Sequence, residues 1–285
     1  MKTIILALWV STGLLSFGSA NAQLKLHVGA TSAYNASFVL DEGLSKDPRY
    51  HSVRTYRLAP VGLAVGLDLT PGFGISLESV YARQGQVFDI IGQVNNVIRQ
   101  VGERNISLDY VQLPLLLNFL NSSNARVRAN FMIGPQFSFL TKGLEIYQQT
   151  QTATFILPVG TKLPAGSTNY DAQTRAYTLA ANTQTIASTE NTNPNNPIEN
   201  FKQAQFGLTT ALGLNVDLGR LVYLSSQIRA NYSITDTRNE EFIQQIRNGN
   251  TGDIFGRRAN LLVGVQLGVH VVFGGTRSSN RMRVK

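Results

Sequence analysis

The sequence has 285 residues, of which 43% are hydrophobic, and a formal net charge of +8 at pH 7. It contains no cysteine, which excludes disulfides, thiol catalysis and thiolate-bound metals. After the first 22 residues, no apolar run approaches the roughly 20 residues that a membrane-spanning helix needs. Any membrane span of the mature chain must therefore be made of strands, which cross lipid only as a closed barrel.

Residues 1–22 have the features of a secretory signal peptide. They begin with a basic residue, Lys2, continue through a short apolar stretch and end in the small-residue sequence Ala-Asn-Ala at 20–22. A membrane anchor is the competing interpretation, but the Ser-Thr-Gly sequence at 11–13 interrupts the apolar stretch early. We therefore expect residues 1–22 to be removed and residues 23–275 to form the folded domain.

Eight stretches of the mature chain alternate apolar and polar residues. In the clearest one, the odd-numbered residues from Leu261 to Phe273 are all apolar, and most of the even-numbered residues between them are polar or small. Side chains alternate between the two faces of a strand, so this pattern predicts strands with one apolar face. A soluble sandwich could show the pattern once or twice, whereas here it recurs to the end of the chain. In chain order, the predicted strands span residues 24–33, 58–70, 73–84, 106–120, 126–140, 205–218, 221–235 and 260–273.

The connectors between these strands are alternately tight and long. The tight ones lie at 70–72, 120–125 and 219–220, and the long ones near 35–57, 85–105, 141–204 and 236–257. Outer-membrane barrels have short periplasmic turns and longer outer loops, and an even strand count puts both chain ends on one side. The sequence therefore predicts an all-β fold, an eight-stranded antiparallel up-and-down transmembrane β-barrel in the outer membrane. Its long loops would be extracellular and both termini periplasmic.

Ionisable side chains predicted to face the barrel interior form a balanced set. Eight strands enclose a space that side chains just fill, so a water-filled pore is not expected. Because unpaired charge is costly in such an interior, we expect a structural charge network in the lumen. Within it, Glu78 and Arg229 fall near mid-strand and could meet across the lumen. The alternative is a site that handles protons or substrate. The predicted network consists of Lys25, Asp68, Glu78, Arg128, Asp217 and Arg229.

Histidine placement gives little support for metal binding or catalysis. His27 and His270 lie on the first and last predicted strands, which are neighbours in a closed barrel, but a metal site usually needs three or four protein ligands. No metal or other cofactor is therefore expected. A lipid hydrolase would need a nucleophile, a base and an orienting group together. His51 and Ser52 are adjacent but show no carboxylate pattern beside them, so the sequence predicts that the protein is not an enzyme.

The segment 141–204 is the longest predicted loop, and it is rich in Thr, Gln and Asn. Alternation at 153–157 and 175–179 predicts strand extensions or a hairpin above the membrane, and 189–200 reads as an irregular tip. Basic residues in the predicted loops would form a rim that contacts the phosphates of lipopolysaccharide, since arginine pairs well with phosphate. These residues are Lys46, Arg49, Arg54, Arg57, Arg99, Arg104, Arg238, Arg247, Arg257 and Arg258.

Three blocks of the sequence resemble the PorT-like outer-membrane β-barrel family of Bacteroidota. Residues 108–117, LDYVQLPLLL, are similar to the family's strand with a tyrosine, a proline and a run of leucines. Residues 134–140, GPQFSFL, resemble its Gly-Pro strand, and residues 232–236, YSITD, its end-of-strand signature. The resemblance implies an eight-stranded outer-membrane barrel without catalytic residues and a link to type nine secretion and gliding. The long segment 141–204 and the basic tail 276–285 depart from the family's compact barrel.

Together these observations lead us to expect a non-enzymatic barrel that is a structural or accessory component of an envelope or type nine secretion complex. The expected partners are outer-membrane lipid, lipopolysaccharide and periplasmic or secretion-complex proteins, the last reached through the basic tail 276–285. Nucleic acid is not an expected partner because a secreted barrel has no access to it. The alternative is a surface protein that captures a ligand or partner with its long extracellular loops.

Overall fold

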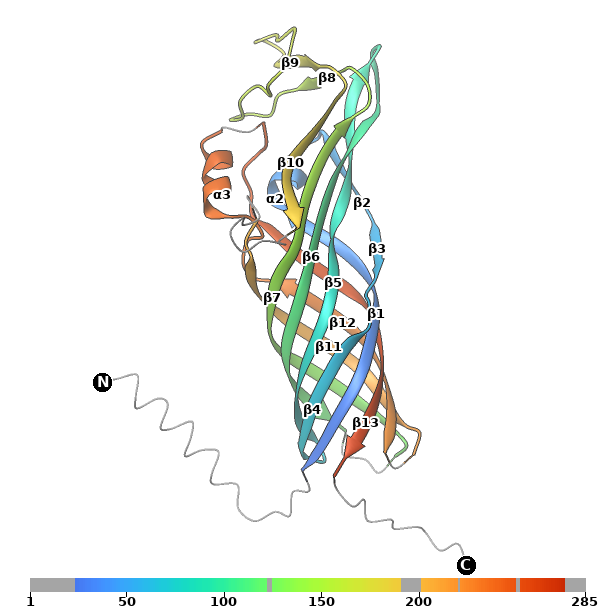
Figure 1. Cartoon of the computed structure of the whole chain (residues 1–285). Helices are drawn as coiled ribbons and strands as arrows, with labels where there is room; N and C mark the ends of the chain where they lie inside the picture. The colour runs from blue at the N-terminus through green and yellow to red at the C-terminus, as the bar shows by residue number, and fades with distance from the viewer. Residues whose placement is uncertain (1–23, 122–124, 191–200, 220, 250–251, 275–285) are drawn as a thin grey trace, which may run out of the picture.

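The computed structural model describes residues 24–121, 125–190, 201–219, 221–249 and 252–274. The expected signal peptide, the basic tail and most of the predicted irregular tip lie outside these ranges. Eight long strands form a closed antiparallel ring, which confirms the predicted barrel (Figure 1). In ring order they are β1 (Lys25–Asp41), β4 (Gly62–Thr70), β5 (Phe73–Val94), β6 (Val97–Leu120), β7 (Val127–Gln149), β11 (Ala204–Asp217), β12 (Val222–Ser233) and β13 (Arg258–Phe273).

The ring closes between the first and the last strand. β13 pairs with β1 from Leu26↔Phe273 to Asp41↔Arg258, so neither strand is left as an edge of the barrel. The strand ends on either side of the predicted tight connectors, at Thr70 and Phe73, Leu120 and Val127, and Asp217 and Val222, lie together at one end of the barrel, which we call the turn end. β1 begins at this end and β13 ends there (Figure 1).

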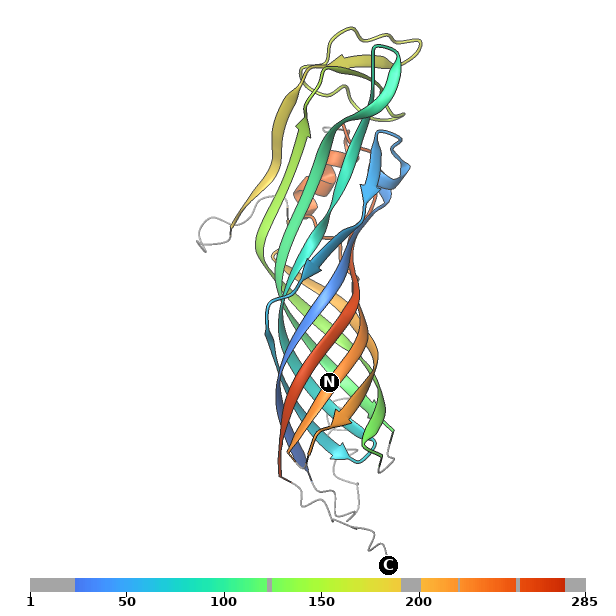
Figure 2. The same cartoon turned by 90° about the vertical axis from the view of Figure 1, so that its right-hand side faces the viewer.

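Beyond the other end of the barrel the chain forms a second, ordered body, which we call the projecting half. Figure 2 shows the outer parts of β5, β6 and β7 continuing from the barrel into a curved sheet. The remaining elements belong to it or to its junction with the barrel: α2 (Glu42–Lys46), β2 (Tyr50–Val53), β3 (Thr55–Leu58), β8 (Ala153–Ile156), β9 (Ala176–Leu179), β10 (Asn182–Glu190) and α3 (Glu240–Arg247). No helix among the described residues is long and apolar enough to cross a membrane.

The prediction of a long loop at 85–105 is wrong. β5 and β6 remain paired up to Val94↔Val97, and a two-residue turn joins them. Asn95 and Asn96 form this turn with φ of 51° and 61°, the left-handed conformation that two-residue hairpin turns require. The predicted long loop at 141–204 is also largely ordered, since β7 continues to Gln149. β8 and β9 pair with each other as the alternation at 153–157 and 175–179 indicates.

The apolar face of a strand changes sides between the two bodies. On β6, Leu115, Leu117 and Phe119 are exposed on the outside of the barrel, whereas Ile106 and Leu108 are buried inside the projecting half. The barrel thus has an apolar exterior and a polar lumen, and the projecting half has an apolar interior. Its core consists of Val39, Leu44, Tyr50, Phe88, Ile90, Val101, Ile106, Leu108, Tyr110, Leu140, Ala153, Phe155, Leu157, Tyr177, Leu179 and Phe201.

Candidate functional site

A polar cluster crosses the lumen and joins Glu78 on β5 to Arg229 on β12. Arg229 Nη1 donates to Glu78 Oε2 at 2.5 Å and to Gln266 Oε1 at 2.5 Å. Gln266, on β13, also donates from Nε2 to Glu78 Oε2 at 3.2 Å. All three side chains are buried. The two charges that we expected at similar depth are therefore in direct contact across the lumen.

The other four predicted lumen residues lie nearer the turn end. Arg128 Nη2 on β7 donates to Asp217 Oδ1 on β11 at 3.1 Å. Asp68 is paired in register with Lys25, and its Oδ1 lies 3.7 Å from His27 Nε2. The structure thus divides the six residues into the Glu78–Arg229 pair and a group at the mouth of the barrel.

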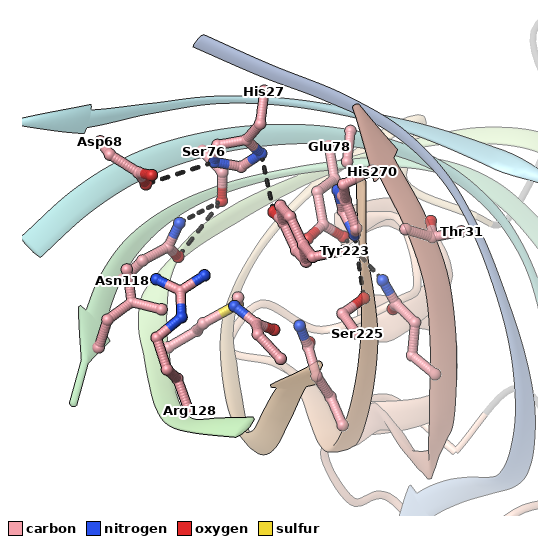
Figure 3. Close-up of a pocket in the computed structure, with 16 residues that line it drawn as sticks. His27, Thr31, Asp68, Ser76, Glu78, Asn118, Arg128, Tyr223, Ser225 and His270 are labelled. Carbon is pink, nitrogen blue, oxygen red and sulfur yellow. Dashed lines mark hydrogen bonds and ion pairs between the residues drawn. The ribbon is translucent and has the colours of Figure 1, made fainter. Parts of the chain in front are cut away.

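Two histidines and a tyrosine fill the lumen between these groups (Figure 3). The Tyr223 hydroxyl is 3.1 Å from His27 Nδ1, and its ring stacks on His270 at a centroid distance of 4.5 Å and an angle of 3°. Ser225 Oγ lies 2.9 Å from His270 Nε2. Tyr223 and Ser225 were not among the predicted site residues, although both occupy inward positions on β12. The register pairs Tyr223 with His270.

Glycines make room for both imidazole rings. A Cβ on Gly66 would lie 2.1 Å from His27 Cε1, and a Cβ on Gly29 would lie 2.3 Å from His270 Nδ1. Each ring therefore lies flat against a stretch of barrel wall that carries no side chain. Within the described residues, no group of three or more His, Asp or Glu side chains is arranged to hold a metal ion.

Two small cavities flank the Glu78–Arg229–Gln266 cluster. The one on the turn-end side has a volume of about 20 Å³, and its lining includes His27, Glu78 and Gln227 (Figure 3). The one on the other side has a volume of about 10 Å³ and is bounded by Arg229 and Gln112. A water molecule needs roughly 10–15 Å³ of such space, so side chains fill most of the lumen.

A second buried ionic network lies in the projecting half. Glu145 on β7 accepts from Arg104 Nε at 2.7 Å and from Arg258 Nη1 at 2.7 Å. Arg258 Nε also donates to Asp41 Oδ2 at 2.6 Å, and the two Arg104 Nη atoms donate to the Asp253 carboxylate at 2.9 Å each. The network joins β1, β6, β7, β13 and the loop that follows α3.

This network corrects the predicted basic rim. Arg49, Arg104, Arg238 and Arg258 are buried and paired with carboxylates, so they do not line an exposed surface. The predicted strands end too early along the chain, so these arginines were expected in loops. Arg57 is partly buried, and the exposed members of the predicted rim are Lys46, Arg54, Arg99, Arg247 and Arg257.

The loop that carries Asp253 is fastened to the sheet by two arginines. Arg49 Nη2 donates to the Gly252 carbonyl at 2.8 Å, and Arg104 binds the adjacent carboxylate. Burial acts to raise the pKa of Asp253, but the neighbouring Arg104 and Arg49 outweigh it and lower that pKa to about 2. Burial likewise acts to raise the pKa of Glu145, which Arg258 and Arg104 lower overall. Both carboxylates are therefore ionised at neutral pH.

The adjacent His51 and Ser52 do not form a catalytic pair. Both lie on β2 and are exposed. Successive side chains of a strand point to opposite faces, which separates the imidazole from the hydroxyl. His51 is instead paired in register with Asp89 on β5.

Exposed apolar side chains gather at the far end of the projecting half. Val97 and Ile98, next to the β5–β6 turn, are 60% and 76% exposed, and Ile156 and Val159 are 65% and 86% exposed. β8, which carries Ile156, pairs with β5 at Gln93↔Thr154, so the two groups lie at the same end of the molecule (Figure 1). We call these four residues the apolar tip.

A polar lumen inside a closed antiparallel barrel with an apolar exterior is the arrangement of a transmembrane barrel. The chain belongs to the family described as outer membrane protein beta-barrel domain, whose model matches residues 20–239. This match confirms an outer-membrane β-barrel protein. No curated protein matches the chain.

The chain is similar to several solved outer-membrane barrels at low sequence identity. OprG from Pseudomonas aeruginosa is 10% identical, with 89% of this chain and 97% of that chain covered and a TM-score of 0.40. Neisserial surface protein A is 9% identical, with 87% and 97% covered and a TM-score of 0.38. The outer membrane protease OmpT from Escherichia coli is 8% identical, with 88% and 97% covered and a TM-score of 0.40.

The presence of OmpT corrects one prediction. The sequence led us to expect that the protein is not an enzyme, but a protease is among the solved outer-membrane barrels to which the chain is similar. That expectation is therefore withdrawn.

Proposed function

We propose that the protein presents a rigid binding platform at the cell surface, with the projecting half outside the cell and the turn end in the periplasm. The orientation is supported by the positions of the tight connectors, because short turns of outer-membrane barrels face the periplasm. The observation that carries the proposal is the construction of the projecting half. The projecting half has its own apolar core and a buried ionic network. Both hold its strands and loops in a fixed shape.

The apolar tip is the part of this platform best suited to contact a partner. Large apolar side chains that gather at one exposed place commonly mark an interaction site. At the tip, Val97 and Ile98 lie next to a two-residue hairpin turn, and Ile156 lies on β8, which pairs with β9. Phe155 on β8 and Tyr177 on β9 belong to the core of the projecting half. A partner would thus meet an ordered surface, with little conformational entropy lost on binding.

Affinity capture with matched point variants tests this role. Tagged protein is crosslinked on intact cells, purified in detergent and compared with Ile98→Asp and with Asn105→Asp, which adds the same charge at an exposed position on β6. We expect a defined partner to be recovered with the parent and with Asn105→Asp, and to be lost with Ile98→Asp. Recovery of the same partner with Ile98→Asp would contradict the platform role. Large deletions within 141–204 are unsuitable because they would remove core residues such as Phe155 and Tyr177.

We also propose lipopolysaccharide as a partner. Fewer basic side chains are exposed to contact it than the sequence suggested. Arg257 is exposed, lies over the Tyr232 ring at 5.8 Å and donates to the Ser233 carbonyl. Arginine and tyrosine together are typical of the level where lipid headgroups meet a barrel. This supports contact between the junction of the two bodies and lipid phosphates.

Membership of an envelope or type nine secretion complex rests on the resemblance to the PorT-like family. The basic tail 276–285, which would make such a contact in the periplasm, lies outside the described residues. Removal of the tail tests this role. Loss of co-purifying periplasmic proteins, with the barrel still folded, would support it.

A further inference from the structure

Four buried side chains next to the lumen cavities have polar atoms without a hydrogen-bond partner among the described residues. They are Gln227 Oε1 and His270 Nδ1 on the turn-end side, and Gln112 Nε2 and Arg229 Nη2 on the other side of the cluster. Each of the four side chains is more than nine-tenths buried. Buried polar groups almost always have a protein or water partner, so these atoms indicate places that water occupies.

The cavities have the size and lining that such water needs. The turn-end cavity, at about 20 Å³, has room for one or two water molecules, and the other, at about 10 Å³, is close to the minimum for one. Gln266 lines both cavities, Glu78 lines the first, and Arg229 lines the second. The Glu78–Arg229–Gln266 cluster is therefore the wall between two polar compartments.

The turn-end compartment leads towards the open mouth of the barrel. Asp68 and Arg128 both line it, and their side chains are 24% and 16% exposed. Neither Glu78 nor Arg229 is more than 5% exposed. Exposure thus decreases from the mouth to the cluster, as expected of a passage that enters from the turn end.

We propose that the lumen is a hydrated track for water, entered from the turn end, and that the Glu78–Arg229–Gln266 cluster is the barrier between its two compartments. The Arg229 guanidinium blocks the track because it spans the lumen to reach Glu78. The inference does not depend on the orientation of the protein in the membrane or on the proposed platform role.

The absence of native cysteine makes the test direct, because one introduced thiol is the only one in the chain. Thr31→Cys reports on the turn-end compartment, and Ala82→Cys reports on the compartment beyond the cluster. The probe is Ag⁺, a small monovalent cation that blocks thiols. Thiols that escape it are counted with a maleimide after unfolding, and the cysteine-free parent gives the background.

The barrier is removed with the double variant Glu78→Gln/Arg229→Gln. Replacing both partners avoids an unpaired buried charge, which would endanger folding. The matched control is Arg128→Gln/Asp217→Asn, which removes a charge pair at the mouth instead. Folding of each variant in detergent is checked by circular dichroism and by the mobility difference between boiled and unboiled samples on gels.

The expected result has three parts. Thr31→Cys reacts with Ag⁺ in the otherwise unchanged protein, and Ala82→Cys does not. The double variant at the cluster raises the reaction rate of Ala82→Cys by about tenfold or more, which corresponds to a lower barrier to entry. The control pair leaves Ala82→Cys protected.

Three results would overturn the proposal. Protection of Thr31→Cys would mean that the first compartment is not reached from outside. Equal reactivity of Ala82→Cys with and without the cluster would mean that the cluster is not the barrier. Protection of Ala82→Cys in the folded double variant would mean that no track continues beyond it.

Discussion

Gly134, on β7, lies where the backbones of β6 and β7 come too close together to leave room for a side chain. A Cβ at this position would be 1.9 Å from the Leu115 carbonyl oxygen, next to Pro114, where the pairing of the two strands is interrupted. Gly134→Ala should therefore lower the free energy of unfolding by about 1–3 kcal/mol, the usual cost of overpacking. Gly219→Ala, in open space at the turn end, is the control and should leave the urea midpoint unchanged. Equal midpoints for both variants would contradict this close approach.

Glu145 is the carboxylate on which the ionic network of the projecting half depends. It contacts both Arg104 and Arg258, and all three side chains are almost fully buried. Glu145→Gln leaves two buried guanidinium groups undercompensated and should reduce stability by about 3–5 kcal/mol. Glu240→Gln, on the exposed side of α3, should change it by less than about 0.5 kcal/mol. Denaturant unfolding in detergent measures both, and a mild effect of Glu145→Gln would show that the network does not hold the projecting half.

Asp253 gives the projecting half a dependence on acid pH. Its pKa is lowered to about 2 from an ordinary value of 3.8, so the folded state holds its proton less tightly than the unfolded chain does. The stability contributed by the Arg104–Asp253 contact is complete above about pH 4 and is lost as the pH falls towards 2. Amide exchange in the loop around Gly252 should rise across this window. The variant Asp253→Asn should show fast exchange at every pH, and Glu240→Gln should keep the pH dependence.

At the scale of the elements, strand alternation predicts the barrel because one environment surrounds it along its whole height. Of the projecting half it predicts only the β8–β9 hairpin, because on β6 the apolar residues move from the outer face at Leu115 to the inner face at Ile106. Bulges at Ile90/Ile91 and Asp109/Tyr110 shift the register as well. When the apolar residues switch from one face of a strand to the other, the alternation is interrupted in the sequence. The segment then resembles a loop, although the strand continues.

The β5–β6 turn has a local requirement that can be tested by itself. Asn96 has a φ of 61°, a conformation that costs roughly 1–2 kcal/mol for most residues other than Gly, Asn and Asp. Asn96→Val should therefore loosen the end of the hairpin and speed amide exchange at Val97 and Ile98. Asn96→Gly should retain the exchange rates of the parent. Slow exchange in Asn96→Val would show that the turn conformation does not control the order of the tip.

At the scale of the whole molecule, the even number of strands and the tight connectors were enough to predict closure between β1 and β13. Depth along the strands was also enough to bring Glu78 and Arg229 together. The network around Glu145 could not be predicted in this way. Its members come from segments far apart in the sequence, and they lie where the strands continue beyond the barrel and its apolar outer face. Arg104 and Arg258 look like surface charges in the sequence, and only the packing of the projecting half buries them.

The proposed platform requires the apolar tip to be at the cell surface. Labelling of Ile98→Cys on intact cells with a membrane-impermeant maleimide measures this directly, with Gly219→Cys at the turn end as the matched control. We predict that Ile98→Cys is labelled on intact cells and that Gly219→Cys is labelled only after the outer membrane is permeabilised. The opposite pattern, with the turn end labelled on intact cells, would contradict the proposed orientation and the binding role that depends on it.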